Sequence, residues 1–461
     1  MSRISGDWFV RVLKGRSNSA GVSVKPRPLS PQDYRLLGLA ALGGALEFYD
    51  FIIFVFFAVV IGKLFFPPGM PEWLLTIQVF GIFGTGYLVR PLGGIVLAHF
   101  GDLFGRKRIF AFSILLMALA TLGMASLPVY ASIGVAAPVL LVITRILQGA
   151  AIGGEVPGAW TFVAEHVPSR QVGFGCGVLC AGLTLGILLG VLVAALINEV
   201  FTPADVAAFA WRIPFFIGGI FGLIAVYLRR WLRETPVFTE MERRHRLVPE
   251  LPLKVVLRDY PHSVVISMLL TWFLSAGVVV TTLMTATFLQ QLYGYTAQQS
   301  LLATGFGTLF LIFGSAAAGA IVDRIGSRGF FVAGSIFFGA ATFTFYSFAA
   351  ASLPIALALY AFMGLSVGVA GAVPYAMVRA FPACVRFTGV SFSYNLSYAV
   401  FGGLTPVTVA LLLPLNPMAP AYYLLFIAAL ALGIGLYLYK NGDRLEFPAG
   451  IEERSVVPSQ Q

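Results

Sequence analysis

Long apolar runs separated by short polar loops make up most of the chain. Twelve stretches of about 20 residues or more lack the polar face of a surface helix. They cover residues 36–61, 73–99, 109–128, 134–160, 172–198, 212–231, 262–291, 299–322, 329–350, 354–378, 388–413 and 419–440. A helix of about 20 apolar residues crosses a hydrocarbon core roughly 30 Å thick and pairs its own backbone amides. The pattern therefore predicts an all-α integral membrane protein with 12 transmembrane helices.

The overall composition supports this class. Hydrophobic residues make up 58% of the 461-residue chain and charged residues 11%. Soluble domains carry roughly 25% charged residues, so a water-soluble fold is excluded. Strands of an outer-membrane barrel would be shorter and would alternate polar with apolar residues.

Basic residues are concentrated in alternate loops. They precede the first span and follow every even-numbered one: Arg3, Arg11, Lys14, Arg16, Lys25, Arg27, Arg35, Arg106, Lys107, Arg108, Arg170, Arg229, Arg230, Arg233, Arg324, Arg328, Arg379, Arg386, Lys440 and Arg444. Loops rich in Lys and Arg stay on the cytoplasmic side, which places both termini in the cytoplasm. The net charge of +10 is thus spread over one membrane face, and no nucleic-acid partner is expected.

A charged loop occurs twice. Gly101-Asp102-Leu103-Phe104-Gly105-Arg106 returns as Val322-Asp323-Arg324-Ile325-Gly326-Ser327-Arg328, with an Asp-to-Asp offset of 221 residues (323 − 102). Such an internal repeat, with one long polar connection between the sixth and seventh spans, is typical of two related bundles that move a solute. The expected organisation is a cytoplasmic disordered tail (1–33), a six-helix bundle (34–232), a cytoplasmic linker (233–260), a second six-helix bundle (261–440) and a second cytoplasmic tail (441–461).

No motif for metal binding or covalent catalysis stands out. Cys176, Cys180 and Cys384 lack the spacing of a metal site, and Cys176 and Cys180, one helical turn apart, are expected to be small core residues rather than a redox pair. We therefore expect no metal, no cofactor beyond a proton gradient, and no enzymatic activity.

Several motifs resemble the major facilitator superfamily. The loop around Asp102 is similar to its signature Gly-x-x-x-Asp-Arg-x-Gly-Arg-Lys, and Arg145-Ile-Leu-Gln-Gly149 to its fourth-helix signature, although Leu103 replaces the usual Arg. Further segments resemble the metabolite:proton symporters, a group that includes citrate, 2-oxoglutarate, shikimate and proline/betaine carriers: Leu46-Glu47-Phe48-Tyr49-Asp50-Phe51, Arg90-Pro91-Leu92-Gly93, Gly153-Gly154-Glu155, Trp211-Arg212-Ile213-Pro214 and Arg233-Glu234-Thr235-Pro236. The resemblance implies a transporter that works by alternating access.

Five ionisable residues lie at membrane depth: Glu47, Asp50, Arg90, Arg145 and Glu155. Each would cost at least ~2.5–3.5 kcal/mol at the bilayer centre, so each is expected to face a cavity or a partner. Asp50 and Arg145 fall at comparable depths, which predicts an ion pair between them, with Glu47 as an alternative partner. In related proton-coupled sugar porters such a pair couples protonation to transport. Proton coupling through Asp50, Glu47, Arg145 and Glu155 is therefore one interpretation, and a permanent structural ion pair is the other.

Polar side chains at similar depth are candidates for contact with the substrate. Arg90 could bind a substrate carboxylate through two parallel hydrogen bonds, or it could pair with Glu155 as an inner gate. The other candidates are Gln148, Tyr49, Thr282, Tyr375 and Asn395. Most hydroxyl groups in such helices bond to neighbouring backbone, which is the alternative for each.

The resemblance also implies a set of latches that stabilise the outward-facing state and do not contact the substrate. Asp102 would dock at the start of the eleventh helix near Arg386, and Arg106 would reach Glu165. The mirror set joins Asp323 to Arg170, together with Arg328 or Arg379, and Gly105 and Gly326 of the two charged loops belong to the latch set. The alternative is that these charges only set topology.

The predicted function is proton-coupled symport of a small metabolite across the cell (inner) membrane by a multi-pass protein. An organic acid anion is favoured over a zwitterion because Arg90 and Arg145 supply buried positive charge. The alternatives are a proton-antiport exporter of metabolites or drugs, and a receptor or scaffold without transport activity. The expected partners are the substrate, protons and lipid, and the expected state is a monomer.

Overall fold

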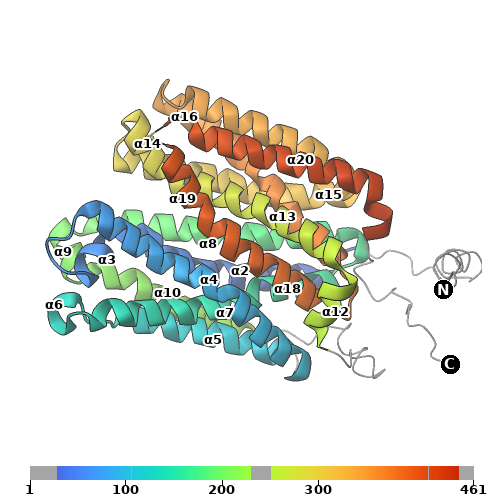
Figure 1. The fold of residues 1–461 in the computed structure, drawn as a ribbon, viewed down its shortest axis with the longest axis horizontal. Helices are drawn as coiled ribbons and strands as arrows, with labels where there is room; N and C mark the ends of the chain where they lie inside the picture. Colours follow the sequence, from blue (N-terminus) through green and yellow to red (C-terminus); the bar gives the residue numbers. More distant parts are fainter. Residues whose placement is uncertain (1–27, 105, 230–250, 414, 446–461) are drawn as a thin grey trace, which may run out of the picture.

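A computed structural model describes residues 28–104, 106–229, 251–413 and 415–445. These residues form a bundle of long helices and contain no β-strand. The helices run nearly side by side, and α2 begins at the same end of the bundle at which α20 ends (Figure 1). The all-helical fold expected from the apolar runs is confirmed for this part of the chain.

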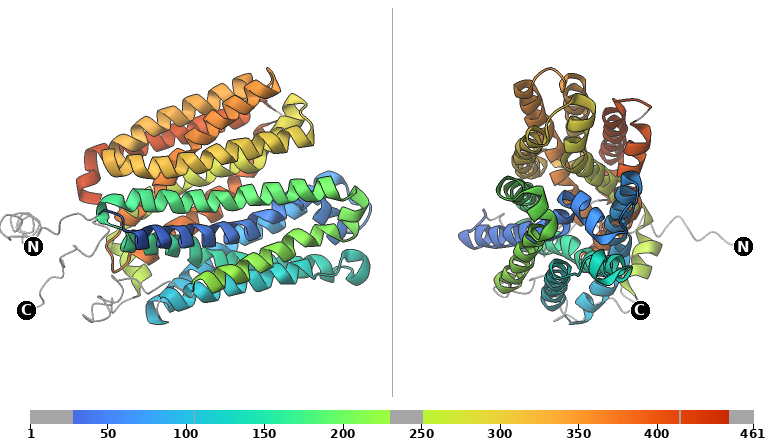
Figure 2. Two further views of the ribbon diagram at one scale, coloured as in Figure 1. Left: turned by 180° about the vertical axis from the view of Figure 1, so that it is seen from behind. Right: turned by 90° about the vertical axis from the view of Figure 1, so that its left-hand side faces the viewer.

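The first part of the bundle runs from α2 to α10, coloured blue to green in Figures 1 and 2. Its helices are α2 (Pro31–Phe56), α3 (Ala58–Phe65), α4 (Glu72–Phe104), α5 (Arg106–Ala125), α6 (Tyr130–Ile133), α7 (Ala136–His166), α8 (Val172–Val200), α9 (Pro203–Ala208) and α10 (Ile213–Arg229). Short 3-10 turns, η1 (Ser169–Gln171) and η2 (Ala210–Arg212), precede α8 and α10.

The second part begins with α12 and is coloured yellow to red. Its elements are α12 (Pro252–Asp259), α13 (Pro261–Val278), η3 (Val279–Met284), α14 (Thr285–Tyr293), α15 (Ala297–Phe348), α16 (Leu353–Val367), η4 (Gly368–Ala372), α17 (Val373–Arg379), α18 (Arg386–Ser397), η5 (Tyr398–Gly402), α19 (Gly403–Leu412) and α20 (Ala419–Leu445). The end-on view in Figure 2 shows these helices grouped on one side of the molecule and α2 to α10 on the other.

Eight described helical segments are long and apolar enough to cross a membrane. One of them, Gln298–Phe348, is 51 residues long. Its helix α15 is interrupted at Gly326, where φ is 76° and ψ is 164°. Only glycine adopts such a conformation readily, so the Gly of the second charged loop ends one helix and allows the next to begin. Two shorter apolar helices cover Gly81–Leu97 and Ala111–Ala125.

Three predicted spans are less regular than the sequence indicates. Residues 262–291 form α13, the π-helical turn η3 and α14, and residues 388–413 form α18, the π-helical turn η5 and α19. Pro406 lacks the N–H that would bond to the carbonyl of Gly402, which accounts for irregular backbone at the end of η5. In residues 354–378 a 3-10 turn, η4, separates α16 from α17.

Two predicted boundaries also move. Helix α2 begins at Pro31, inside the predicted tail, because Ser30 and Asp33 form a capping box that starts the helix there. Helix α20 runs on to Leu445, past the predicted end at residue 440. The remaining residues of both predicted tails, and most of the linker, lie outside the described part of the chain.

Glycines allow the helices to approach closely. A Cβ at Gly182 or Gly186 of α8 would collide with the backbone of α2 at Ala41 or Ala45. Gly149 of α7 meets Gly86 of α4, and Gly364 of α16 meets Gly307 of α15. Gly86 and Gly307 are 221 residues apart (307 − 86), the offset of the two charged loops.

Candidate functional site

Asp50 is fully buried between α2, α5 and α10. Its carboxyl group lies against the backbone of α10, so that a Cβ at Gly218 would collide with Oδ1 and one at Gly222 would lie 3.3 Å from Oδ2. Neither carboxyl oxygen has a hydrogen-bond partner among the described residues. A buried carboxyl group without donors is far less costly when it is protonated than when it is ionised.

The predicted Asp50–Arg145 ion pair is not present in this conformation. Arg145 Nη1 donates instead to Gln148 Oε1 at 2.7 Å and to the Phe51 carbonyl at 3.4 Å. Gln148 Nε2 then donates to Thr121 Oγ1 at 2.8 Å, and Thr121 bonds to the Met117 carbonyl.

These hydrogen bonds link Arg145, through Gln148, to Thr121, and Thr121 lies close to Asp50. A Cβ on Gly218, which meets Asp50, would lie 3.2 Å from the methyl group of Thr121. Thr121 was not predicted as a site residue, and the one signal for it is a hydroxyl group within an apolar span. Because Arg145 Nε and Nη2 have no hydrogen-bond partner among the described residues, the guanidinium keeps donors for a carboxylate.

Aromatic rings, rather than carboxylates, surround the two buried arginines. The Arg90 guanidinium lies 4.4 Å from the Tyr87 ring centre, 4.5 Å from Phe51 and 5.0 Å from Tyr398. Arg145 lies 4.5 Å from the same Phe51 ring. Ring faces attract cations, which lowers the cost of burying both charges. None of the three Arg90 side-chain nitrogens has a hydrogen-bond partner among the described residues.

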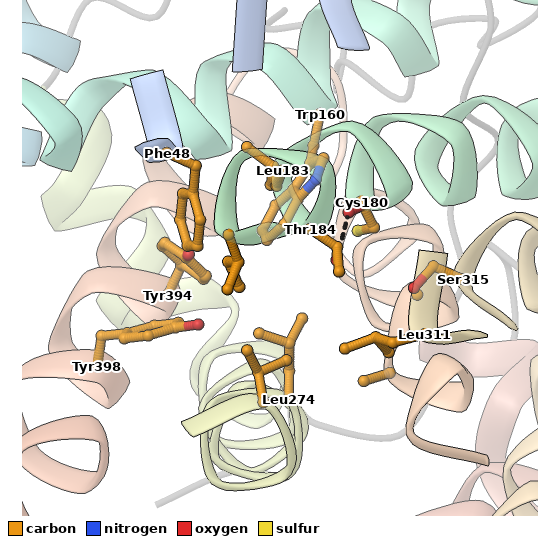
Figure 3. Close-up of a pocket in the computed structure, with 14 residues that line it drawn as sticks. Phe48, Trp160, Cys180, Leu183, Thr184, Leu274, Leu311, Ser315, Tyr394 and Tyr398 are labelled. Atoms are coloured by element: carbon orange, nitrogen blue, oxygen red, sulfur yellow. Dashed lines mark hydrogen bonds between the residues drawn. The ribbon is translucent and has the colours of Figure 1, made fainter. Parts of the chain in front are cut away.

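A cavity of about 40 Å³ lies between the two parts of the bundle (Figure 3). Side chains from α2, α7, α8, α13, α15, η4, α18 and η5 line it. Phe48 and Trp160 come from the first part, and Tyr394 and Tyr398 from the second. No charged residue is among the lining side chains, which are otherwise mostly aliphatic: Leu183, Ile187, Leu274, Val278 and Leu311.

Tyr398 separates this cavity from Arg90. Its ring lines the cavity and also faces the Arg90 guanidinium, and it stacks on Tyr87 at 5.8 Å between ring centres. None of the six predicted substrate contacts lines the cavity, so its aromatic residues were missed in the sequence. Aromatic residues make up 14% of the chain, and these rings carry no spacing that distinguishes them.

Three of the predicted substrate contacts are engaged within the protein. Tyr49 donates its hydroxyl to the Pro214 carbonyl at 2.9 Å, and Thr282 donates to Val278 within its own helical segment. Asn395 donates to the Gly153 carbonyl at 2.6 Å and so joins α18 to α7. Tyr375 is buried beneath the guanidinium of Arg379, 5.2 Å from its ring centre.

The remaining acidic candidates are buried in the first part of the bundle. Glu47 lies one turn before Asp50 in α2, and Glu155 lies in α7, with 3% and 1% of their surfaces exposed. Neither is in the cavity lining. The roles of Glu47 and Glu155 in proton coupling stay predictions.

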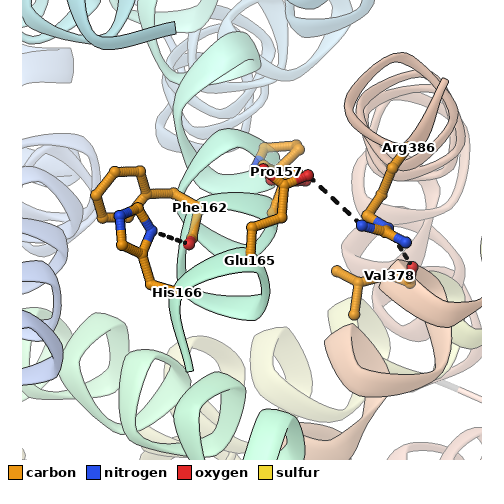
Figure 4. Close-up of polar contacts among 7 residues, drawn as sticks. Pro157, Phe162, Glu165, His166, Val378 and Arg386 are labelled. Carbon is orange, nitrogen blue, oxygen red and sulfur yellow. Dashed lines mark hydrogen bonds and ion pairs between the residues drawn. The ribbon is translucent and has the colours of Figure 1, made fainter. Parts of the chain in front are cut away.

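Polar contacts join the two parts near the end of α7 and at the start of α8. Arg386 at the start of α18 pairs with Glu165 near the end of α7 at 3.5 Å, and it also donates to the Val378 carbonyl (Figure 4). Both side chains of the pair are completely buried. Glu165 had been expected to contact Arg106, but the side chains of Asp102 and Arg106, and Gly105 itself, lie outside what the structure describes.

The second charged loop docks on a helix N-terminus. Asp323 accepts hydrogen bonds from the backbone N–H groups of Gly173 and Phe174 at 2.8 and 2.7 Å. Unpaired N–H groups and the helix dipole favour a carboxylate at that position. The predicted side-chain partner, Arg170, lies just before this N-terminus in η1. Arg328 follows Gly326 in α15, and its role as a latch stays a prediction.

No group of three or more His, Cys, Asp or Glu residues suited to a metal ion occurs in the described ranges. The features present are many apolar spans, an internal repeat, buried charges and a cavity between two helix groups. Together they define a membrane transporter.

Comparison with known proteins identifies the family. Residues 40–406 match the profile of the Major Facilitator Superfamily. The chain is 32% identical over 427 residues to the proline/betaine transporter of Salmonella typhimurium, a match covering 88% of this chain and 83% of that protein. The same identity and coverage relate it to the glycine betaine/proline/ectoine/pipecolic acid transporter OusA of Dickeya dadantii.

The fold is also similar to a solved structure of the proton:xylose symporter XylE bound to 6-bromo-6-deoxy-D-glucose. The TM-score is 0.74 at 17% identity, with 88% of this chain and 95% of that chain covered. The chain belongs to the Major Facilitator Superfamily. It is a multi-pass cell-membrane transporter of a small metabolite and not an enzyme.

Proposed function

We propose that this transporter is a proton-coupled symporter in which two six-helix bundles, residues 34–232 and 261–440, expose a central site alternately to each side. The shared 221-residue offset of the charged loops and of the Gly86 and Gly307 crossings supports two repeats. The count of twelve spans follows if α15 crosses twice, α4 and α5 cross once each, and α18, η5 and α19 form one span. The charge distribution supports cytoplasmic termini.

The relatives change the proposed substrate class. The organic acid anion favoured by the sequence was argued from two buried arginines, but a zwitterion also carries a carboxylate that the unpartnered nitrogens of Arg90 can bind. The relatives are named as transporters of proline, betaine, ectoine and pipecolic acid. We therefore propose a small zwitterion as the substrate, with Arg90 as the group that binds its carboxylate.

The observation that carries proton coupling is the buried carboxyl group of Asp50, which has no hydrogen-bond donor. In the conformation described, the proton is held there. When the helices rearrange, release of the proton leaves a carboxylate near the Thr121–Gln148–Arg145 chain, and the unused Nε and Nη2 donors of Arg145 can then stabilise it. Glu47 and Glu155 are the alternative carriers.

Replacing Asp50 with Asn tests this proposal in proteoliposomes. An outside-acid gradient should drive accumulation of labelled glycine betaine or proline by the unchanged protein, but not by Asp50→Asn. Exchange of substrate across the membrane without a gradient should persist in the variant, because it needs no net proton movement.

Asp259→Asn is the matched control. The Arg258 guanidinium donates to Asp259 at 2.8 Å and holds the pKa of this exposed carboxyl group below its ordinary value, outside the membrane spans. Its replacement should leave accumulation unchanged. Full proton-driven accumulation by Asp50→Asn would rule out Asp50 as the carrier, and accumulation driven only by inside-acid gradients would indicate an antiporter.

A further inference from the structure

We infer that Phe48, Trp160, Tyr394 and Tyr398 form an aromatic cage for the cationic end of the substrate, and that this cage selects an alkylated ammonium group. The inference rests on the proposed function, since it describes how the same central cavity holds a zwitterion.

The four rings come from both parts of the bundle. Phe48 lies on α2 and Trp160 on α7, whereas Tyr394 lies on α18 and Tyr398 opens η5. The rings of Trp160 and Tyr394 meet edge to face at 5.0 Å, and those of Tyr394 and Tyr398 lie 4.6 Å apart at 54°. Figure 3 shows the four side chains converging on the same empty space. The cage is therefore complete only when the two parts of the bundle lie together.

The chemistry of the lining fits a cation without N–H groups. No acidic or basic side chain lines the cavity, so a bound anion would have no charged partner there. The lining holds the hydroxyl oxygens of Thr184, Ser315 and two tyrosines, but no carboxylate that could take the charge-assisted hydrogen bonds of a primary ammonium group. An alkylated ammonium group has no such donors to satisfy and needs only ring faces.

The size of the cavity limits what enters it. At about 40 Å³ it holds roughly three water molecules, taking 10–15 Å³ for each. It therefore takes one end of the substrate rather than the whole molecule. Tyr398 forms the wall between the cavity and Arg90, so a shift of this ring places the carboxylate of a bound zwitterion beside the guanidinium. The two ends of the substrate are then recognised by different chemistry.

The test is equilibrium binding to the purified full-length protein, measured by calorimetry with two probes of the same shape. Glycine betaine carries a trimethylammonium group, and tert-butylacetate replaces its nitrogen with carbon and has no positive charge. Glycine betaine should bind roughly 10- to 30-fold more tightly, which corresponds to the attraction expected between a desolvated cation and ring faces.

Trp160→Leu should reduce that ratio to below about threefold by weakening glycine betaine alone, whereas Trp160→Phe, which keeps a ring, should preserve it. Phe48→Leu supplies an independent variant if Trp160→Leu does not fold. Phe162→Leu is the control, since Phe162 lies on the same helix but packs against His166, 4.1 Å between ring centres.

Equal affinity for the two probes, or an unchanged ratio in both cage variants, would overturn the inference. Proton-driven uptake of a dicarboxylate by a protein that does not bind glycine betaine would overturn the cage and leave symport intact. Selective binding without any proton-driven accumulation would support the cage and refute symport instead.

Discussion

Asn395 of α18 donates a hydrogen bond of 2.6 Å to the carbonyl of Gly153 in α7, 242 residues away. In a regular helix this carbonyl would accept the N–H of residue 157. That residue is proline and has no N–H, so Pro157 leaves the Gly153 carbonyl available to the other part of the bundle. A proline that interrupts one helix thus creates the acceptor that joins two helices.

Asn395→Ala should weaken the association of α18 with α7. Loss of one hydrogen bond of about 1 kcal/mol shifts the equilibrium between closed and open arrangements roughly fivefold. Cys180 lines the central cavity, so its labelling by a maleimide should speed up by that factor in a Cys176→Ala, Cys384→Ser background. Asn441→Ala removes a hydrogen bond within one helix and should have no effect on labelling.

Gly319→Ala should hinder closure of the two parts. A Cβ at Gly319 would collide with the carbonyl of Gly173, where α15 crosses α8. Overpacking of about 1–2 kcal/mol would lower the closed population, and with it the rate of substrate exchange, roughly 5- to 30-fold. Gly433→Ala meets no atom within 4 Å and should exchange at the normal rate. Normal exchange by Gly319→Ala would show that this crossing opens without cost.

Asp323→Asn should expose the start of α8. The carboxylate accepts from two backbone amides, and an Asn side chain offers only one acceptor oxygen and loses the charge that the helix N-terminus favours. Hydrogen exchange at Gly173 and Phe174 should accelerate roughly 5- to 30-fold, as expected for a loss of about 1–2 kcal/mol. Arg324→Gln changes the neighbouring exposed charge and should leave these two amides protected.

Gln148→Leu should destabilise the first part of the bundle. It leaves Arg145 Nη1 without its 2.7 Å acceptor, at a cost of about 1.5–3 kcal/mol for a buried charged donor. Thr121→Val removes the hydrogen-bond partner of Gln148 Nε2. Because both substitutions break the same hydrogen bond, their effects on the free energy of unfolding should depart from additivity by at least ~0.5 kcal/mol. Unfolding of the two single variants and the double variant measures this departure. Strict additivity would show that the hydrogen bond between Gln148 and Thr121 contributes nothing to stability.

The sequence predicted the features that depend on local pattern. The apolar runs that are long enough to cross a membrane form helices, and the second charged loop contains the turn at Gly326. Both features depend on the hydropathy and backbone conformation of a few neighbouring residues. Asp323 also docks at the start of a helix, but it accepts hydrogen bonds from backbone amides rather than from the predicted partner Arg170.

The pairing of buried side chains could not be predicted in the same way. Asp50 and Arg145 were placed at similar depth, but Asp50 faces Gly218 of α10, whereas Arg145 bonds to Gln148 of its own helix. A helix that is apolar all round gives no sign of which face meets which neighbour. For the same reason Trp160 and Tyr398 resembled the many other aromatic residues that pack against helices.

The buried carboxyl group of Asp50 has an electrical consequence. Under the proposed mechanism the zwitterion carries no net charge, and the proton on Asp50 is the charge that each cycle moves inward. Uptake would then be electrogenic, and a negative potential inside the cell would contribute about 2.3 kcal/mol per 100 mV to accumulation even without any difference in pH.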